Sequence, residues 1–321
     1  MAGKRLTAKE KKKRARRRFW TGIFACSLVA ALCILITVSE QMTHPFLPTW
    51  EEIFVKVGLA DPPPAEGELR VRVLDVGNAD CILARCGGQS LLIDAGEKES
   101  GPDIVSALRR EGVKKLDYVI ATHPDADHIG GMAEVISSLD IGTFIMAPMP
   151  EEATPTTRTY TAMLEALAAK GLRFTTAKPG AQYALGEARL DILGPTEEYR
   201  ETNNQSVVCK LTFGSKRLLF MGDAEKEAEN ALLAAHTDVR ADVIKLGHHG
   251  SASSSQREFL EAVGAKTALI TCGAGNAYGH PEEETLATLR ALDITAYRSD
   301  VCGDITVTTD GQTLTVTTEE G

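Results

Sequence analysis

Four side chains that commonly bind metal ions follow one predicted strand. His123, Asp125, Asp127 and His128 come directly after a short apolar run, residues 118–121, that predicts a buried strand. Imidazole and carboxylate ligands must converge on a cation from short, stiff backbone, and this spacing can send one pair of side chains each way. A solvated acidic turn would explain the aspartates but not the histidines that frame them. We therefore expect this loop to hold two divalent metal ions.

Three more candidate ligands lie in the second half of the sequence. Asp223 stands between a predicted strand, residues 217–221, and a predicted helix, residues 224–235, so its spacing fits either a metal ligand or the N-cap of that helix. His248 and His249 lie between two glycines after another apolar run. We assign His248 to the metal and His249 to catalysis, although the spacing also allows the reverse.

A further histidine lies close to the C-terminal part of the sequence. His280 stands in the short motif Tyr278-Gly279-His280-Pro281, ahead of a predicted helix over residues 282–292. A histidine at this place can serve as a general acid or contact a phosphate. The competing explanation is a histidine that only orders the loop before the helix. We assign His280 to catalysis together with Asp127 and His249.

The elements that must position these residues alternate along the chain. The predicted strands cover residues 69–74, 80–84, 90–93, 118–121, 143–146, 173–176, 188–193, 207–212, 217–221, 241–246, 267–271, 305–309 and 313–317. The predicted helices cover residues 104–110, 132–139, 157–170, 224–235, 256–263 and 282–292. This order fits an α/β fold with two sheets packed face to face and helices outside. We expect the C-terminal hairpin to close the second sheet.

The metal loop is one of several motifs that together resemble a known family. Its HxDxDH pattern resembles the signature of the metallo-β-lactamase fold, in the variant of the extracellular nuclease-like domain of ComEC-type DNA-uptake (competence) proteins. The resemblance runs from about Leu69 to Gly311. It includes the blocks LDVGNAD (74–80), LLIDAG (91–96), NNQSVV (203–208), FMGDAE (220–225), KLGHHGS (245–251) and YGHP (278–281). It implies a metallo-β-lactamase αββα sandwich.

The resemblance also implies how ligands divide between two ions. It makes Asp223 the carboxylate that bridges both. The first ion would be held by His123, Asp125 and Asp223, an oxygen-rich set that favours Mn²⁺ or Mg²⁺ over Zn²⁺. The second would be held by Asp127, His128, Asp223 and one of the paired histidines, and would be more zinc-like. We expect Mn²⁺ to be the best activator.

Other motif residues are expected to support the site or contact the substrate. They are Asp80, Asp94, Asn204, Ser206 and Ser251. The resemblance places Asp94 beside the metal loop as an orienting group, with Asp80 facing the same loop, while turn formation would explain both nearly as well. Two departures from the general pattern concern the first ion. Asp125 occupies the position of the usual second histidine. Residues 203–206 occupy the segment in which many relatives have a further histidine.

The N-terminal region predicts a membrane anchor. A basic tail, residues 1–18, precedes the uncharged segment Phe19–Val38, which is long enough to span a bilayer as a helix. The positive-inside rule places the tail in the cytoplasm and the rest outside the cell. A cleaved signal peptide is the alternative. A Pro-rich linker, residues 39–67, with a short amphipathic helix over 49–59, leads to the hydrolase domain, residues 68–321.

Charge and cysteine content narrow the function. Residues 1–20 carry ten basic side chains and one acidic one, and the remainder carries 25 basic and 43 acidic ones, a net charge of −18. Such acidity opposes adhesion to nucleic acid by counterion release, although bound cations can supply the attraction. The five cysteines beyond the membrane segment are an odd number and lie outside the metal motifs, which favours core packing.

These features predict a membrane-anchored extracellular metal-dependent hydrolase, most simply a phosphodiesterase or nuclease that acts on DNA through a metal-activated hydroxide. The channel domain of ComEC-type proteins is not found in this sequence, so we expect trimming or scavenging of extracellular DNA rather than import by this chain itself. One alternative is hydrolysis of a small nucleotide, lactone or thioester. Another is a non-enzymatic metal-binding sensor or assembly partner. The sequence leaves the oligomeric state open.

Overall fold

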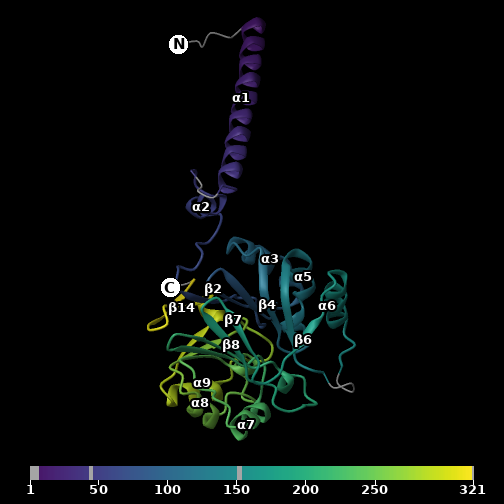
Figure 1. The fold of residues 1–321 in the computed structure, drawn as a ribbon, viewed down its shortest axis with the longest axis vertical. Helices are drawn as coiled ribbons and strands as arrows, with labels where there is room; N and C mark the ends of the chain where they lie inside the picture. Colours follow the sequence, from purple (N-terminus) through teal and green to yellow (C-terminus); the bar gives the residue numbers. More distant parts are fainter. Residues whose placement is uncertain (1–6, 43–45, 150–153, 320–321) are drawn as a thin grey trace. The chain divides into compact units, whose positions relative to one another are not determined.

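The computed structural model describes residues 7–42, 46–149 and 154–319 and divides the chain into two units that meet between Pro62 and Pro63 (Figure 1). The first unit contains α1 (Ala8–Glu40) and α2 (Trp50–Lys56). Among the described residues, α1 is the one helix long and apolar enough to cross a membrane. The predicted span therefore lies inside a longer helix, which also takes up the described part of the basic tail.

Residues 1–6 of the predicted tail and residues 43–45 of the predicted linker lie outside the described residues. The short helix predicted after the linker begins is present as α2. Thr49 caps it, because the Thr49 hydroxyl accepts a hydrogen bond from the Glu52 N–H and the Glu52 carboxylate accepts one from the Thr49 N–H. This reciprocal capping box explains why so short a helix forms at this place.

The second unit is a sandwich of two sheets. The eight-stranded sheet has the spatial order β15-β14-β1-β2-β3-β4-β5-β6, formed by β1 (Leu69–Val73), β2 (Ile82–Cys86), β3 (Gln89–Ile93), β4 (Lys115–Ala121), β5 (Asp140–Met146), β6 (Phe174–Thr176), β14 (Ile305–Thr309) and β15 (Leu314–Thr318). The seven-stranded sheet has the order β13-β12-β11-β10-β9-β8-β7, formed by β7 (Gln182–Leu185), β8 (Ala188–Ile192), β9 (Cys209–Phe213), β10 (Lys216–Phe220), β11 (Val243–Lys245), β12 (Thr267–Ile270) and β13 (Thr295–Arg298).

Helices cover the outer faces of the sandwich. Those on the first sheet are α3 (Gly101–Arg110), α5 (Met132–Ser138) and α6 (Arg158–Ala169), and those on the second are α7 (Lys226–Ala234), α8 (Arg257–Val263) and α9 (Glu283–Ala291) (Figure 1). Alternate residues of the inner strands, such as Val71 on β1 and Leu211 on β9, form a buried apolar core between the sheets. The predicted αββα architecture is therefore confirmed.

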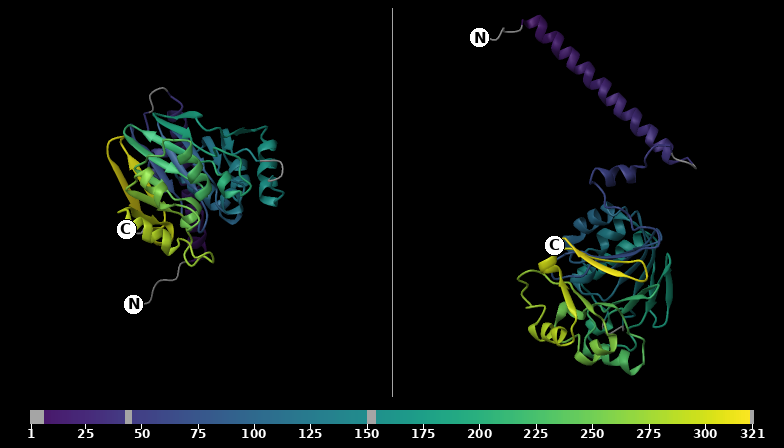
Figure 2. Two further views of the ribbon diagram at one scale, coloured as in Figure 1. Left: turned by 90° about the horizontal axis from the view of Figure 1, so that it is seen from below. Right: turned by 90° about the vertical axis from the view of Figure 1, so that its left-hand side faces the viewer.

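The C-terminal hairpin corrects one topological prediction. We expected it to close the second sheet, but β14 pairs antiparallel with β1, with Val307 opposite Val71, and so extends the first sheet. Figure 2 shows this hairpin in yellow along one edge of the domain. Strand β14, in which alternate residues are buried, pairs with the edge of β1, which is more than two hundred residues away in sequence. Local pattern alone does not specify such a long-range pairing.

Two short strands were not predicted from the sequence. They are β7 and β13, which form the two edges of the seven-stranded sheet. In both strands most residues are exposed or half-buried, so neither shows the apolar alternation that marks an inner strand.

The metal loop contains one turn of helix that was not among the predicted helices. A single helical turn, α4 (Ala126–Ile129), carries Asp127 and His128. A Cβ atom on Gly130, the next residue, would lie only 2.3 Å from the Lys98 backbone nitrogen. Glycine at this position therefore lets the turn pack directly against the neighbouring chain.

Candidate metal centre

The candidate ligands leave the carboxyl ends of strands that are neighbours in space. β3 and β4 run parallel in the first sheet, and β10 and β11 run parallel in the second. Asp94 follows β3, the metal loop follows β4, Asp223 follows β10, and the paired histidines follow β11 in the short turn η4 (Gly247–Gly250). Because the carboxyl ends of parallel strands meet at one sheet edge, residues far apart in sequence gather there.

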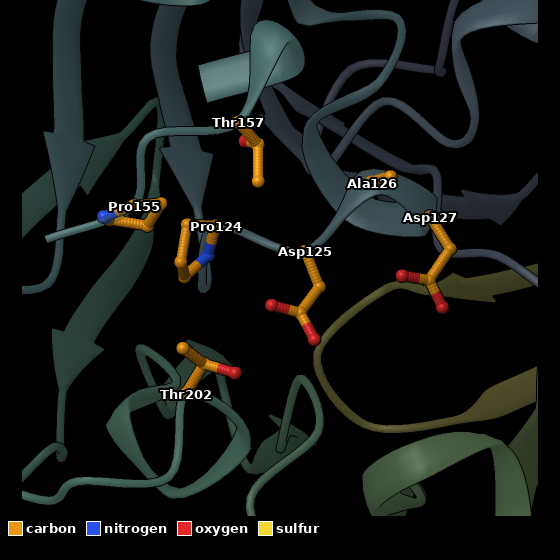
Figure 3. Close-up of a pocket in the computed structure, with 7 residues that line it drawn as sticks. All are labelled: Pro124, Asp125, Ala126, Asp127, Pro155, Thr157 and Thr202. Atoms are coloured by element: carbon orange, nitrogen blue, oxygen red, sulfur yellow. The ribbon is translucent and has the colours of Figure 1, made fainter. Parts of the chain in front are cut away.

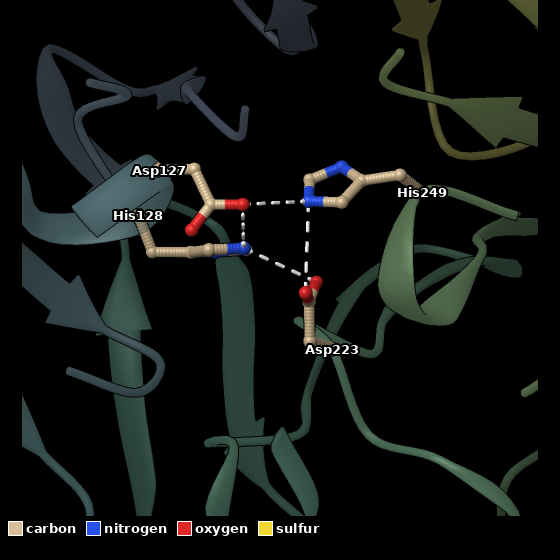
Figure 4. A group of neighbouring side chains, drawn as sticks. All are labelled: Asp127, His128, Asp223 and His249. Carbon is tan, nitrogen blue, oxygen red and sulfur yellow. Dashed lines mark hydrogen bonds and ion pairs between the residues drawn. The ribbon is translucent and has the colours of Figure 1, made fainter. Parts of the chain in front are cut away.

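Four of these side chains form a compact cluster. Asp127, His128, Asp223 and His249 each present one ligand atom within 4.8 Å of the others (Figure 4). His249 Nε2 lies 3.3 Å from Asp127 Oδ2, and His128 Nε2 lies 3.2 Å from Asp223 Oδ1. Three of the four residues are buried, whereas Asp127 is half-buried and remains in contact with solvent. We call this set the four-residue cluster.

The chemistry of the cluster fits a divalent cation. Among the described residues, His128 Nε2, Asp223 Oδ1 and His123 Nε2 are buried and make no hydrogen bond. A buried polar atom without a hydrogen-bond partner costs free energy, and unpaired atoms of this kind are rare in native proteins. Imidazole nitrogens and carboxylate oxygens that point at one another are the donors that Zn²⁺ and Mn²⁺ use. The residues present therefore fit a bound metal ion.

Asp94 holds His128 in the orientation that a metal ligand needs. Asp94 Oδ2 lies 2.7 Å from His128 Nδ1, and both side chains are fully buried. The carboxylate is itself held by Thr122, whose N–H donates to Oδ1 at 2.8 Å and whose hydroxyl donates to Oδ2 at 2.6 Å. Since His128 Nδ1 donates to the carboxylate, Nε2 faces the cluster. This is the contact that the predicted orienting role of Asp94 requires.

His249 is oriented by groups that the sequence reasoning only partly identified. His249 Nδ1 donates to the Thr271 carbonyl at 2.9 Å, and the Thr271 hydroxyl donates to Asp80. Lys245 Nζ lies 2.9 Å from Asp80 Oδ2. Burial would raise the pKa of Asp80, but the Lys245 ammonium outweighs it and lowers that pKa. Asp80 was expected near the loop, whereas Thr271 and Lys245 were not singled out, although Lys245 begins the KLGHHGS block.

The paired histidines point in different directions, and the geometry groups His249 rather than His248 with the other clustered side chains. Both have left-handed backbone, with φ of 46° at His248 and 53° at His249. His249 turns inward and is nearly fully buried, whereas the His248 side chain is 27% exposed. His248 Nε2 is 4.0 Å from Asp223, and its Nδ1 contacts Glu225 Oε1 at 2.8 Å. The four-residue cluster thus contains His249, and not His248 as we had assigned.

The residues expected to hold the other ion are less closely packed. His123 Nε2 lies 3.8 Å from Asp125 Oδ2 and 3.9 Å from Asp223 Oδ2, and the Asp125 side chain is 44% exposed. The Ser206 hydroxyl lies 3.3 Å from His123 Nδ1 and accepts a hydrogen bond from the Asp223 N–H at 3.0 Å. Ser206 therefore connects His123 with the backbone of Asp223. We call His123, Asp125 and the shared Asp223 the open group.

Burial and mutual charge prepare these side chains for a cation. Burial and the charge of His128 lower the pKa of His123 to about 3, so His123 is neutral. Burial would also lower the pKa of His128, but the carboxylates of Asp223 and Asp94 outweigh burial and raise that pKa. Burial would raise the pKa of Asp127, but its histidine neighbours outweigh it and lower the pKa to about 2. A cation that binds His128 would therefore displace a proton.

Two other predicted site residues, Asn204 and Ser251, have clear structural partners. Asn204 Oδ1 accepts hydrogen bonds from the N–H groups of Glu225 and Ala228, at 3.0 and 3.2 Å, so Asn204 caps α7. The Ser251 hydroxyl lies 3.0 Å from that of Ser253. Asn204 therefore supports the loop that carries Asp223 rather than facing a substrate.

The same helix end decides between the two interpretations of Asp223. α7 begins at Lys226 with Glu225 at its N-cap position. Asp223 lies before that position and points into the cluster instead (Figure 4). The alternative in which Asp223 only caps the helix is wrong.

His280 stands beside the paired histidines. Its ring centroid lies 5.2 Å from that of His248 and 6.4 Å from that of His249. Its Nδ1 is buried and makes no hydrogen bond within the described chain. Burial and then the charge of His248 lower the pKa of His280, so its ring is neutral at neutral pH. His280 therefore lies next to the paired histidines as a neutral ring, and its predicted catalytic role stays a prediction.

A pocket of about 430 Å³ opens beside the half-buried side of the cluster (Figure 3). Its lining residues are Pro124, Asp125, Ala126, Asp127, Pro155, Thr157 and Thr202. Two of them, Asp125 and Asp127, are candidate ligands from the metal loop. The pocket therefore adjoins the metal loop on the side where Asp127 contacts solvent.

Comparisons with known proteins agree with this geometry. The profile of the metallo-beta-lactamase superfamily matches residues 74–273. ComE operon protein 3 of Bacillus subtilis is 30% identical over 260 residues, which cover 75% of this chain and 33% of that protein. Competence protein ComA of Neisseria gonorrhoeae is 30% identical over 241 residues, which cover 74% of this chain and 32% of that protein. The chain thus spans about a third of the length of these relatives.

A solved structure is similar at the level of the fold. CmlA, a diiron beta-hydroxylase from Streptomyces venezuelae, is 14% identical with a TM-score of 0.50, over 80% of this chain and 60% of that one. At this identity the similarity concerns the fold alone.

Proposed function

The chain belongs to the metallo-beta-lactamase superfamily, and from this premise we propose that it is a membrane-anchored, metal-dependent phosphodiesterase that acts on DNA outside the cell. The observation that supports metal-dependent hydrolysis is the four-residue cluster, in which the buried atoms His128 Nε2 and Asp223 Oδ1 face one another without a hydrogen-bond partner. Support for DNA comes from relatives that include a named competence protein. Support for the anchor comes from α1, whose basic end we place in the cytoplasm.

The proposed ligands divide into a tight and a loose position. Asp127, His128, Asp223 and His249 would hold one ion, and His123 and Asp125 would hold a second that shares Asp223. Mn²⁺ or Zn²⁺ suits the mixed nitrogen and oxygen donors, and Mg²⁺ suits the oxygen-rich open group. When bound, two cations would lower the pKa of a water molecule and stabilise charge on the oxygens of a phosphodiester.

The chain's own residues then supply orientation and a proton. Asp127 faces both the cluster and the pocket, so its free carboxylate oxygen can orient a water molecule for attack. His248 stands beside Asp223, and Glu225 accepts its Nδ1–H at 2.8 Å, which leaves Nε2 toward the site. We assign His248 to protonation of the leaving oxygen, in place of His249, with His280 beside it. Ser251 remains a candidate contact for a phosphate oxygen.

One observation favours a second candidate substrate. The pocket beside Asp127 has a volume of about 430 Å³, which is within the range of small-molecule sites, and its lining contains two carboxylates and no basic residue. A small phosphodiester or nucleotide would fit it without the extended basic surface that DNA binding usually needs. This alternative keeps the same metal centre and changes only the substrate.

Activity of the purified full-length chain tests both substrates. In detergent with Mn²⁺, it should release nucleotides from linear DNA and p-nitrophenol from bis(p-nitrophenyl) phosphate. Asp127→Ala should lose both activities, whereas the matched control Asp103→Ala, an exposed position on α3, should keep them. Cleavage of the small ester alone would support the second candidate. Equal activity of Asp127→Ala and wild type would refute the proposed function.

A further inference from the structure

The segment after α1 folds back against the end of that helix. The Ser39 hydroxyl accepts hydrogen bonds from the N–H groups of Phe46 and Leu47, both at 3.0 Å. The Trp50 indole N–H donates to the Thr37 hydroxyl at 3.1 Å. Thr37 and Ser39 lie in the last turns of α1, so these bonds fix Trp50 at the level where the apolar part of the helix ends. We call the described residues 46–59 the elbow.

The elbow exposes more apolar surface than a short soluble segment needs. Phe46, Phe54, Val57 and Leu59 are 59%, 42%, 62% and 65% exposed, respectively. The Trp50 and Phe54 rings lie 5.7 Å apart and continue this surface toward α1. Contiguous exposed apolar side chains mark a surface that another phase or partner covers. Their continuity with a helix suited to cross a bilayer identifies lipid as the occupant.

We propose that the elbow lies in the lipid interface at the C-terminal end of α1, with Trp50 at headgroup level and Phe46, Phe54, Val57 and Leu59 inserted beneath it. This inference rests on the proposed membrane anchor. Tryptophan prefers this zone because its ring is apolar and its N–H is polar. Short amphipathic segments bind there through their apolar face. The hydrolase domain would then leave the membrane from a fixed surface element rather than from a free linker.

The two tryptophans of the chain, Trp20 and Trp50, allow a direct test. The full chain is reconstituted in phosphatidylcholine vesicles whose acyl chains are brominated either near the headgroup or near the chain end. Trp20→Phe leaves only Trp50, and Trp50→Phe leaves only Trp20. We expect Trp50 fluorescence to be quenched more by the bromines near the headgroup and to be protected from aqueous acrylamide.

The single-tryptophan variants separate this inference from the anchor itself. Quenching of Trp20 with a solvent-exposed Trp50 would keep the anchor and overturn the elbow proposal. A Trp50 protected from both acrylamide and brominated lipid would indicate a protein contact and would also overturn it. Failure of both tryptophans to respond to brominated lipid would contradict the anchor, without bearing on hydrolysis.

A different observation supports a second inference, about a buried ion pair next to the metal centre. Lys245 and Asp80 are both about 1% exposed, and the Lys245 ammonium also donates to the Leu246 carbonyl at 2.8 Å. The other carboxylate oxygen of Asp80 accepts a hydrogen bond from the Thr271 hydroxyl and lies 3.5 Å from His249 Nδ1. No proposed catalytic step uses Lys245. A fully buried lysine is rare, because its charge must be compensated where water is excluded.

These contacts form a chain that ends at a proposed metal ligand. Lys245 holds Asp80, and Asp80 holds the Thr271 hydroxyl. The Thr271 carbonyl accepts the His249 Nδ1–H, which leaves the Nε2 lone pair directed at the four-residue cluster. We infer that Lys245 and Asp80 are positioning residues that fix the ring orientation and tautomer of His249. This inference rests on the proposed metal site, because positioning matters only if His249 binds a cation.

Variants of the pair distinguish positioning from a purely structural role. Lys245→Met and Asp80→Asn each leave one buried group without its partner, so each should lower the Tm. The double variant removes both charges and should regain much of the lost Tm. If the pair positions His249, the double variant should still bind Mn²⁺ about 10-fold more weakly than wild type, as measured from free Mn²⁺ by electron paramagnetic resonance. Recovery of Tm and affinity together would overturn the inference.

Thr271 provides a matched pair of variants that keeps the test decisive if the double variant does not fold. Thr271→Ser retains the hydroxyl and should keep wild-type Mn²⁺ affinity, whereas Thr271→Val retains the shape and should lose affinity. Equal affinity of the two variants would contradict the hydrogen-bonded chain. A wild-type protein that binds no Mn²⁺ would instead contradict the proposed function.

Discussion

The two halves of the metal centre are built differently. In the four-residue cluster, each histidine has a buried partner behind it, because Asp94 holds His128 and Thr271 holds His249. In the open group, the Nδ1 atom of His123 contacts the hydroxyl groups of Thr122 and Ser206 rather than a buried carboxylate, and the Asp125 side chain is 44% exposed. A ligand that is held in place before the metal arrives loses less conformational freedom on binding. The comparison therefore predicts one tight and one weak metal position.

The shared ligand gives the largest expected effect. Within the part of the chain that the structure describes, Asp223 is the one carboxylate within 4 Å of histidines from both groups. Asp223→Ala should therefore abolish binding at both positions and lower activity by more than about 100-fold, beyond the range typical of residues behind a ligand. Metal content by mass spectrometry and phosphodiester hydrolysis measure these outcomes. If the variant retained two ions for each chain, the shared position of Asp223 would be incorrect.

The paired histidines sharpen the contrast between the two groups. His249→Ala should remove the tightly bound ion, because it deletes a buried ligand. His248→Ala should leave metal content near wild type and mainly lower kcat, because His248 lies outside the cluster and is assigned to proton transfer. Metal content and kcat measured on both variants compare neighbouring residues of the same type. The opposite pattern would restore the sequence-based assignment.

A change behind the tight position should have an intermediate effect. Asp94→Asn keeps the size of the side chain but weakens its hold on His128 Nδ1, so metal affinity should fall by about 10- to 100-fold. Titration with Mn²⁺ measures this loss. An unchanged affinity would mean that Asp94 serves only the turn in which it lies.

A change in the open group should have a smaller effect. Asp125→Asn should raise the Mn²⁺ concentration needed for half-maximal activity by only a few-fold, because Asp125 is half exposed and water can replace it. Asp125→His would add an imidazole and should shift the preferred activator from Mn²⁺ toward Zn²⁺. Activity measured against the concentration of each metal tests both variants. If Asp125→Asn weakened activation by Mn²⁺ as much as His249→Ala does, the prediction of one tight and one weak metal position would be contradicted.

The smallest expected effect concerns pH. Burial would lower the pKa of His248, but its hydrogen bond with Glu225 outweighs this and raises that pKa. The protonated form of His248, which can donate a proton, therefore persists to higher pH than for an ordinary histidine. Glu225→Gln should lower the pKa and move the alkaline limb of the kcat profile to lower pH. A limb that does not move would exclude His248 as the proton donor.

Local pattern predicted the order of the strands and helices, and the resemblance to a known family implied the αββα sandwich and the roles of Asp223 and Asp94. Strand ends followed by glycines and by clustered histidines or aspartates mark places where the backbone turns at a sheet edge. The inner strands and all six long helices of the domain carry apolar periodicity that can be read directly. The structure brings Asp223, Asp94 and the metal loop together at one sheet edge, and their roles in metal binding stay predictions.

What the sequence could not give depends on contacts between distant segments. The adjacent histidines 248 and 249 are chemically alike, and they differ in their partners, which are Glu225 for His248 and Thr271 for His249, both distant in sequence. Thr271 contributes through its backbone carbonyl, which has no sequence signature. The pairing of β14 with β1 and the edge strands β7 and β13 likewise depend on long-range pairing rather than on periodicity.

Anomalous X-ray diffraction from crystals equilibrated with limiting and then excess Mn²⁺ tests the central claim most directly. The unequal metal centre predicts a strong anomalous peak among Asp127, His128, Asp223 and His249 at limiting Mn²⁺. It predicts a second peak beside His123 and Asp125 only at excess Mn²⁺. The absence of a peak among the four clustered side chains, or a first peak beside His123, would contradict the account.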